Sequence, residues 1–162
     1  MPLRYEGLVR LLVQRLKFSG DLAAARPLVE SLQAAVASGR DDQPLPDALL
    51  PVPLHPRRLA ERGFNQAERL ARPLSKQLGV PLSLNSLRRG VATAAQSQLD
   101  ARARRRNVRG AFAVCGPVPD HVAIVDDVVT TGSTVSEIAR ILRRAGCKRI
   151  EVWAAARAPA PD

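Results

Sequence analysis

The sequence VAIVDDVVTTGST, residues 122–134, decides the fold of this chain. Its first four residues are apolar and mostly β-branched, which predicts a strand buried on both faces. Two adjacent carboxylates, Asp126 and Asp127, follow at the C-terminal end of that strand. A short loop of hydroxyl residues around Gly132 then leads into apolar residues at helical spacing, and Thr134 with Glu137 fits a capping box. The predicted order is strand, acidic pair, small-residue loop and helix N-terminus.

The loop between the acids and the helix has the chemistry of a phosphate site. A helix N-terminus directs backbone N–H groups at one spot, where the helix dipole favours negative charge. Gly132 lets the backbone approach a bound group closely, and the hydroxyls add donors. Carboxylates accept hydrogen bonds from sugar hydroxyls, so the pair suits the ribose of a sugar phosphate at the end of a strand. A plain strand-to-helix turn, the alternative, gives no packing reason for an apolar strand to end in Asp-Asp.

The whole stretch resembles the phosphoribosyl-pyrophosphate (PRPP) motif of the type I phosphoribosyltransferases. Four hydrophobic residues, two acids, two hydrophobic residues and Thr-Thr-Gly-x-Thr occur without a gap. The resemblance implies an α/β protein with the type I phosphoribosyltransferase fold. That fold is a mostly parallel twisted sheet flanked by helices, with an excursion that carries a hood and a flexible loop.

Length and composition limit the remaining possibilities. We expect the 162 residues to form a single phosphoribosyltransferase-like domain with a sizeable core. No apolar run has membrane-spanning length and the N-terminus lacks a signal-peptide core, so the cytoplasm is the expected location. Cys115 and Cys147 lack metal-ligand spacing, and we expect both to be buried and reduced.

The chain is strongly basic, with a net charge of +10 and a pI near 11.2, and arginine outnumbers lysine. Three explanations stay open: a compositionally biased genome, a polyanionic small substrate, and nucleic acid. Aromatic residues are scarce, which disfavours a stacking platform for single-stranded nucleic acid.

An N-terminal helical part is predicted within residues 1–40. Apolar spacing predicts one helix over residues 5–18 and a second over residues 21–37. Asp21 caps the second helix, and Pro27 predicts a kink or a late start in it.

A second strand–loop–helix unit follows this helical part. Residues 49–54 predict the first core strand, irregular or near an edge because of its prolines. A basic loop over residues 55–64 comes next, and then a helix that Asn65 caps, with Glu68 at the capping-box position. An anion-friendly loop between a strand and a capped helix predicts a second phosphate site.

The segment over residues 82–115 is expected to form a hairpin that carries the flexible loop. Its short apolar ends, residues 82–88 and 111–115, either pair with each other or extend the sheet. The basic residues between them, with a short helix expected over residues 100–107, are either a solvated basic helix or a mobile arm that closes over a polyanion.

The end of the chain repeats the alternation of helix and strand. Gly146 is expected to end the helix that starts after the PRPP-like loop, and residues 149–156 predict a final strand with Trp153 as a packing residue. His121 is expected at the surface, and residues 158–162 as a frayed tail. Alternating strands and helices imply a parallel sheet.

Further motifs narrow the resemblance to the ComF/GntX group of phosphoribosyltransferase-like proteins, and they cover nearly the whole chain. Members of this group usually carry a cysteine zinc module ahead of the first helix; this sequence has no such cysteines there, so we expect the module to be truncated or lost. The motifs are Leu16-Lys17-Phe18-x-Gly20, Pro51-Val52-Pro53-Leu54-x-x-Arg57-Arg58, Arg62-Gly63-Phe64-Asn65-Gln66, Thr93-x-x-Gln96-x-x-Leu99 and Arg106-Asn107.

The resemblance assigns a role to each motif around the sugar phosphate. Asp126 and Asp127 would be the catalytic acids that hold the ribose hydroxyls. In the flexible loop, Gln96 and Arg106 are the residues of interest, with Arg106 sealing the site. The 5-phosphate would lie on Thr130, Thr131, Gly132, Ser133 and Thr134, and the pyrophosphate against Leu54, His55, Arg57, Arg58 and Arg62.

The resemblance also implies magnesium, which would bridge the pyrophosphate and the ribose hydroxyls of PRPP. Most of its ligands would be oxygens of substrate and water, so no metal site made by protein side chains alone is expected.

Two functions follow as expectations. The first is a phosphoribosyltransferase-like protein that binds PRPP with magnesium and transfers the phosphoribosyl group to a nitrogen acceptor, with release of pyrophosphate. The second is a non-catalytic competence or DNA-uptake accessory protein that binds single-stranded DNA. A homodimer is expected by analogy with the family, and the sequence leaves the acceptor open.

Overall fold

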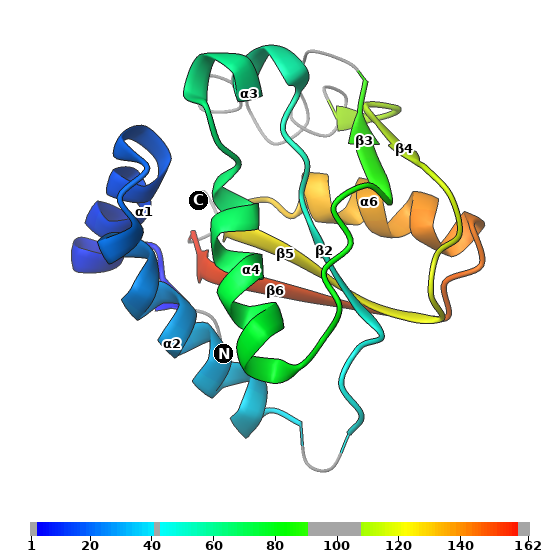
Figure 1. Ribbon diagram of the computed structural model, residues 1–162, viewed down its shortest axis with the longest axis horizontal. Helices are drawn as coiled ribbons and strands as arrows, with labels where there is room; N and C mark the ends of the chain where they lie inside the picture. Colours follow the sequence, from blue (N-terminus) through cyan, green and yellow to red (C-terminus); the bar gives the residue numbers. More distant parts are fainter. Residues whose placement is uncertain (1–2, 41–42, 91–107, 159–162) are drawn as a thin grey trace.

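The computed structural model describes residues 3–40, 43–90 and 108–158. Its centre is a four-stranded parallel sheet with the order β1-β6-β5-β2 (Figure 1). Residues 122–125 of the central strand are fully buried, as a parallel strand covered on both faces should be. The strands are β1 (Leu3–Arg4), β2 (Ala48–Pro51), β5 (His121–Val129) and β6 (Arg149–Arg157).

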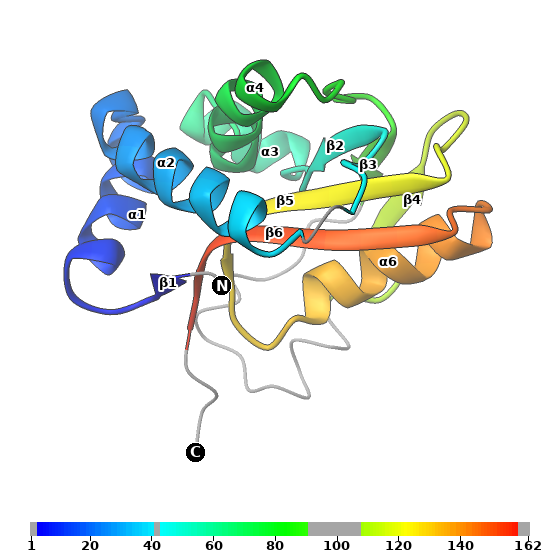
Figure 2. The same cartoon turned by 90° about the horizontal axis from the view of Figure 1, so that it is seen from below.

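Helices cover both faces of this sheet (Figure 2). On one face lie α1 (Gly7–Ser19), α2 (Leu22–Ser38) and α4 (Gln66–Leu78). On the other face lie α6 (Ser133–Arg144) and a two-stranded antiparallel hairpin of β3 (Leu87–Arg89) and β4 (Phe112–Val114). The mixed α/β class and the parallel sheet are as predicted.

Two hydrophobic clusters hold these layers together, one on each face of the sheet. Ala123 and Val125 belong to the cluster with α1, α2 and α4, whereas Val122 and Ile124 belong to the cluster with α6 and the hairpin. Successive side chains along a strand point to opposite faces, so β5 alone supplies both clusters.

The structure differs from the sequence expectations at two elements around β5 and β2. Strand β5 runs on through both acids to Val129, so the acids lie inside its C-terminal part and not beyond its end. The predicted basic loop contains a helix, α3 (Pro56–Arg62), whose first residue is a proline, the residue that favours this position. Of the two short apolar segments, residues 87–89 pair with residues 112–114, with Leu87 opposite Val114, whereas Leu82 forms an isolated parallel bridge to Leu49 of β2.

Helix caps agree with the sequence in two cases and differ in two. The Asp21 side chain caps α2 and the Asn65 side chain caps α4. Helix α2 continues through Pro27. Neither predicted capping box is present: Glu68 pairs with Arg72 one turn ahead, and α6 begins at Ser133 with no side-chain cap.

Two expectations about single residues are corrected. His121 is buried and not at the surface, because its ring contacts the Glu151 carboxylate. Cys115 is only partly buried, whereas Cys147 is buried as expected, and both are free thiols.

Residues 100–107 and 159–162, for which a short helix and a frayed tail were expected, lie outside the described residues. Among the helices that the structure describes, none has the length and apolarity needed to cross a bilayer.

Candidate functional site

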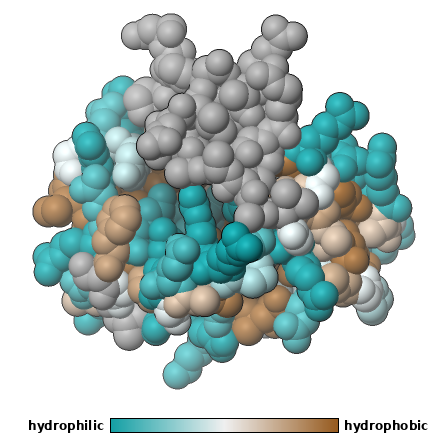
Figure 3. Space-filling model, turned by 90° about the horizontal axis from the view of Figure 1, so that it is seen from above, coloured by the Kyte–Doolittle hydropathy of each residue, from teal (hydrophilic) through white to brown (hydrophobic). Residues whose placement is uncertain are grey.

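A cavity of about 500 Å³ lies over the C-terminal part of β5, where the strand passes into α6. It collects side chains from both faces of the sheet, because α1 reaches it from one side and β3 from the other. The described residues that line it are Tyr5, Lys17, Phe18, Val52, Leu54, Arg58, Arg62, Gln66, Arg89 and residues 126–135. Figure 3 views the molecule from the side on which α3 lies, and hydrophilic side chains gather near the centre of that face.

The two acids occupy different environments in this cavity. Asp127 is almost fully buried, with 4% of its side chain exposed, and its Oδ2 lies 2.9 Å from Nζ of Lys17 on α1. Asp126 is partly buried and accepts a 2.9 Å hydrogen bond from the backbone N–H of Asp127. The alternation along β5 explains the difference, because Asp127 shares the face of α1 and Asp126 the face of β3.

This arrangement raises the pKa of Asp126 well above the ordinary value of an aspartate. Burial is the largest cause, followed by the charge of Asp127 and a hydrogen bond with its side chain. The backbone N–H of Asp127 and the charge of Lys17 act in the opposite direction. The Asp126 carboxyl group therefore carries charge less readily than an ordinary aspartate.

The loop after the acids has the geometry of an anion cradle. Gly132 adopts a left-handed conformation with φ of 74° immediately before α6, a conformation that glycine adopts without the strain of a side chain. The hydroxyls of Thr131 and Ser133 are hydrogen-bonded at 2.8 Å. Helix α6 has 12 residues, so its first-turn N–H groups and its dipole act at the cavity wall.

Arginine side chains from two other elements form the opposite wall. Arg58 and Arg62 come from α3, and Arg62 donates a 2.7 Å hydrogen bond to Gln66. Arg89 comes from β3, is buried, and stacks over the ring of Phe112 at 5.3 Å. Burial and the neighbouring charge of Arg58 lower the pKa of Arg89, while Asp126 raises it. Two guanidinium groups held near each other favour an anion between them.

Most of the residues predicted from the sequence meet in this cavity. Leu54, Arg58 and Arg62 line it, and so do both acids and every residue of the loop 130–134. His55 and Arg57 are not among the lining residues: the His55 side chain caps α3 by accepting a hydrogen bond from the Arg57 backbone, and Arg57 is exposed. Gln96 and Arg106 lie outside the described residues.

Two cationic residues of the cavity have no role assigned from the sequence. Lys17 belongs to a motif that the family resemblance marks, but its partner Asp127 is 110 positions away. Arg89 stands at the start of the basic segment, which holds many arginines, and the sequence alone does not show which of them reaches the cavity. A signal for Arg89 exists in hindsight: it alternates with exposed Arg88 on a strand whose Leu87 is buried.

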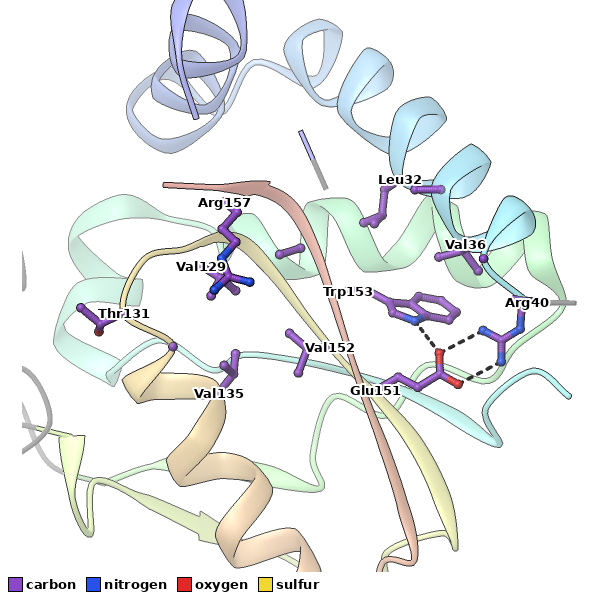
Figure 4. Close-up of a pocket in the computed structure, with 14 residues that line it drawn as sticks. Leu32, Val36, Arg40, Val129, Thr131, Val135, Glu151, Val152, Trp153 and Arg157 are labelled. Carbon is purple, nitrogen blue, oxygen red and sulfur yellow. Dashed lines mark hydrogen bonds and ion pairs between the residues drawn. The ribbon is translucent and has the colours of Figure 1, made fainter. Parts of the chain in front are cut away.

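A second cavity, of about 620 Å³, lies on the other side of the loop, between α2 and β6 (Figure 4). Its walls are mainly apolar, with Leu32, Val36 and Trp153 on one side and Val135 on the other. At one end, Glu151 binds Arg40 through two hydrogen bonds of 3.0 Å and accepts one of 2.9 Å from the Trp153 indole. The two cavities share Val129, Thr131, Gly132 and Val135.

Comparisons with known proteins find a matching family model and several similar proteins. The model of the phosphoribosyl transferase domain matches residues 60–161. The DNA utilization protein YhgH of Salmonella typhi is 44% identical over 146 residues, covering 88% of this chain and 64% of that protein. Competence protein F of Haemophilus influenzae is 40% identical over 154 residues, covering 91% and 67%. The solved purine phosphoribosyltransferase of Pyrococcus horikoshii Ot3 aligns with a TM-score of 0.48 at 17% identity, over 83% of this chain and 81% of that one.

A parallel sheet with an acidic pair and a small-residue loop at the end of its central strand defines the phosphoribosyltransferase class. The chain belongs to this domain family, within its ComF group. The chain spans 64% of the length of the YhgH protein of Salmonella typhi.

Proposed function

We propose that this chain binds PRPP, as its magnesium complex, in the cavity at the end of β5. One observation carries the proposal: an anion cradle, a pair of acids and three arginines from two further elements, α3 and β3, line one cavity of about 500 Å³. A phosphorylated sugar with a pyrophosphate group needs this combination, because its two ends are anionic and its middle carries hydroxyl donors.

Each part of the ligand has a matching wall. The 5-phosphate would lie on the loop 130–134, where backbone N–H groups and hydroxyls converge. The ribose hydroxyls would donate to the acids of β5. The pyrophosphate would lie against Arg58, Arg62 and Arg89, whose guanidinium groups bind phosphate oxygens in pairs.

Magnesium fits this donor set only together with the ligand. Among the described residues, no group of three His, Cys, Asp or Glu side chains could hold a metal ion. Magnesium keeps several waters and binds through one or two carboxylates plus substrate phosphates, so PRPP would supply much of the coordination. The ion would supply charge neutralisation to the leaving pyrophosphate.

Transfer of the phosphoribosyl group would need no nucleophilic side chain. The bond between C1 and the pyrophosphate oxygen breaks, a bond forms between C1 and the acceptor nitrogen, and the nitrogen releases a proton to solvent. The arginine wall would stabilise the charge that develops on the leaving pyrophosphate. The acids and the cradle would fix the sugar between donor and acceptor.

Isothermal titration with PRPP and magnesium tests the proposal. We expect the double variant Asp126→Asn/Asp127→Asn to bind at least about tenfold more weakly, because hydrogen bonds to charged groups are each worth about 1.5–3 kcal/mol. Asp120→Asn is the matched control, because Asp120 is an exposed acid whose carboxylate pairs with Lys148. Equal affinity of the double variant and wild type would contradict the site. Pyrophosphate release with candidate nucleobases, amines or ammonia then tests turnover.

A non-catalytic role with single-stranded DNA is the second proposal. The specific observations are the names of the relatives, a DNA utilization protein and a competence protein, and the net charge of +10. Binding of a labelled oligonucleotide should then weaken steeply with salt, because phosphate contacts release counterions. Negligible affinity at low salt would count against this function and leave the PRPP proposal untouched.

We also propose that the chain acts in the cytoplasm and, from the family resemblance, that it forms a homodimer. Light scattering coupled to size exclusion is the measurement. A monomer at concentrations well above those of the binding assays would contradict the dimer.

A further inference from the structure

The ion pair between Lys17 and Asp127 links the N-terminal helical layer to the acids of β5. Lys17 Nζ lies 2.9 Å from Asp127 Oδ2, and 27% of the Lys17 side chain and 4% of the Asp127 side chain are exposed. A buried carboxylate without a cationic partner would be costly, so the contact determines where the Asp127 side chain can lie.

Lys17 acts on the second acid through its charge, which lowers the pKa of Asp126. Asp126 itself is oriented by the strand, because its Oδ1 accepts a 2.9 Å hydrogen bond from the backbone N–H of Asp127. With its Oδ2 2.9 Å from Lys17 Nζ and only 4% of its side chain exposed, Asp127 presents little of its carboxylate to a ligand. Asp126 is partly buried and keeps its position on the cavity wall.

We propose that Lys17 is a positioning residue of the ribose site: it holds the Asp127 carboxylate from α1 and leaves Asp126 as the acid that accepts hydrogen bonds from the ribose hydroxyls. This inference rests on the proposed PRPP site. It divides the work of the two neighbouring acids, with one ordering the site and the other contacting the sugar. It also makes α1, an element outside the PRPP-like stretch, part of ribose recognition.

Electrostatics give this arrangement a measurable signature. The charge of Lys17 is one of the influences that lower the pKa of Asp126 against the larger effects of burial and of Asp127. Removal of that charge raises the pKa of Asp126 further. Among the residues that the structure describes, the other titratable and charged groups lining the cavity are Tyr5, Arg58, Arg62 and Arg89, and they are the same in every variant compared.

The test compares Lys17→Met, Lys17→Arg and Lys148→Met with wild type. Lys148→Met is the matched control, because it removes a lysine–aspartate ion pair of 2.7 Å that is exposed. We expect Lys17→Met to bind ribose 5-phosphate about tenfold more weakly at pH 7. On acidification its affinity should fall at a higher pH than that of wild type, whereas Lys17→Arg and Lys148→Met should follow wild type.

Inorganic pyrophosphate separates positioning from direct phosphate binding. We expect Lys17→Met to bind pyrophosphate within about twofold of wild type, because the effect passes through the acids. Equal weakening toward pyrophosphate and ribose 5-phosphate would make Lys17 a phosphate ligand and overturn the proposal. A uniform loss of affinity at every pH, with no displaced midpoint, would show a merely structural role and overturn it as well.

A ¹³C NMR titration of the Asp126 carboxyl in ligand-free protein keeps the two proposals apart. The midpoint should move upward in Lys17→Met and stay in place in Lys148→Met. An unmoved midpoint overturns the role of Lys17 whatever the protein binds. Failure of wild type to bind PRPP or ribose 5-phosphate, with the midpoint moved, would instead count against the proposed function.

Discussion

Arg89 shows how one side chain of the hairpin can serve the cavity. It is buried over Phe112, close enough to Arg58 and Asp126 for both to affect its pKa. We expect Arg89→Met to weaken binding of inorganic pyrophosphate about tenfold, because a charge-assisted contact to phosphate oxygen is lost. Titration calorimetry at fixed ionic strength measures this.

The neighbouring Arg88 is the control for that experiment. It is exposed and points to the other side of the same strand. Arg88→Met removes the same charge from the chain and should change pyrophosphate affinity by less than about twofold. Similar losses in both variants would mean that net charge, and not a specific contact, governs binding.

Residues of the site could be predicted from sequence where they are contiguous. Asp126, Asp127 and the loop 130–134 stand together, and the structure keeps them in one cavity. Lys17 and Arg89 join them only through tertiary packing, from helix α1 and strand β3. His55 is not among the lining residues for a local reason: a side chain ahead of Pro56 can cap a helix, and this one accepts the Arg57 N–H.

Helix α6 depends on its preceding glycine in place of a capping side chain. The predicted partner in the capping box, Glu137, instead binds Arg140 and accepts a 2.8 Å hydrogen bond from the Gly110 backbone. These contacts tie α6 to the start of the chain leading into β4. The spacing of residues in the sequence could not predict these contacts of Glu137, because one partner, Gly110, is 27 positions away.

Substitution of that glycine tests the element directly. Gly132 has φ of 74°, and an added Cβ would meet nothing closer than 3.9 Å. The free-energy cost of a substitution therefore comes from the backbone conformation alone. We expect Gly132→Ala to lower the free energy of unfolding by about 1–2 kcal/mol. Denaturant unfolding measures this, with Ser136→Ala on the exposed side of α6 as a control that should change little. An unchanged stability would show that the loop adopts another conformation.

At the scale of the whole molecule, Glu151 joins segments that are far apart in sequence. Its carboxylate contacts Arg40 after α2, His121 at the start of β5 and Trp153 on β6. Burial alone would raise the pKa of Glu151, but hydrogen bonds from Arg40, Trp153 and His121 outweigh it, so the pKa is lowered. The layers and parallel order of the sheet were predictable from alternating patterns, whereas this cross-link was not.

This lowered pKa predicts a loss of stability in acid. A carboxyl group with a lower pKa in the folded state contributes stability above its unfolded pKa of about 4.3, and loses it as pH falls through the folded pKa. We expect Glu151→Gln to cost about 1 kcal/mol or more at pH 7 and progressively less below pH 4. Thermal unfolding at several pH values measures this. Glu30→Gln, which removes an exposed pair with Arg26, should differ little from wild type at any pH.

The wall that the two cavities share affects how compounds that bind this protein would be classified. Val129, Thr131, Gly132 and Val135 face both spaces. A small apolar compound that binds in the cavity between α2 and β6 and displaces the loop would expel a sugar phosphate bound in the cavity at the end of β5. The two molecules would never overlap. Competition in a displacement assay therefore does not show which of the two cavities a compound occupies. The Glu151→Gln variant is altered only in the cavity between α2 and β6, so it offers a way to tell the two kinds of competition apart.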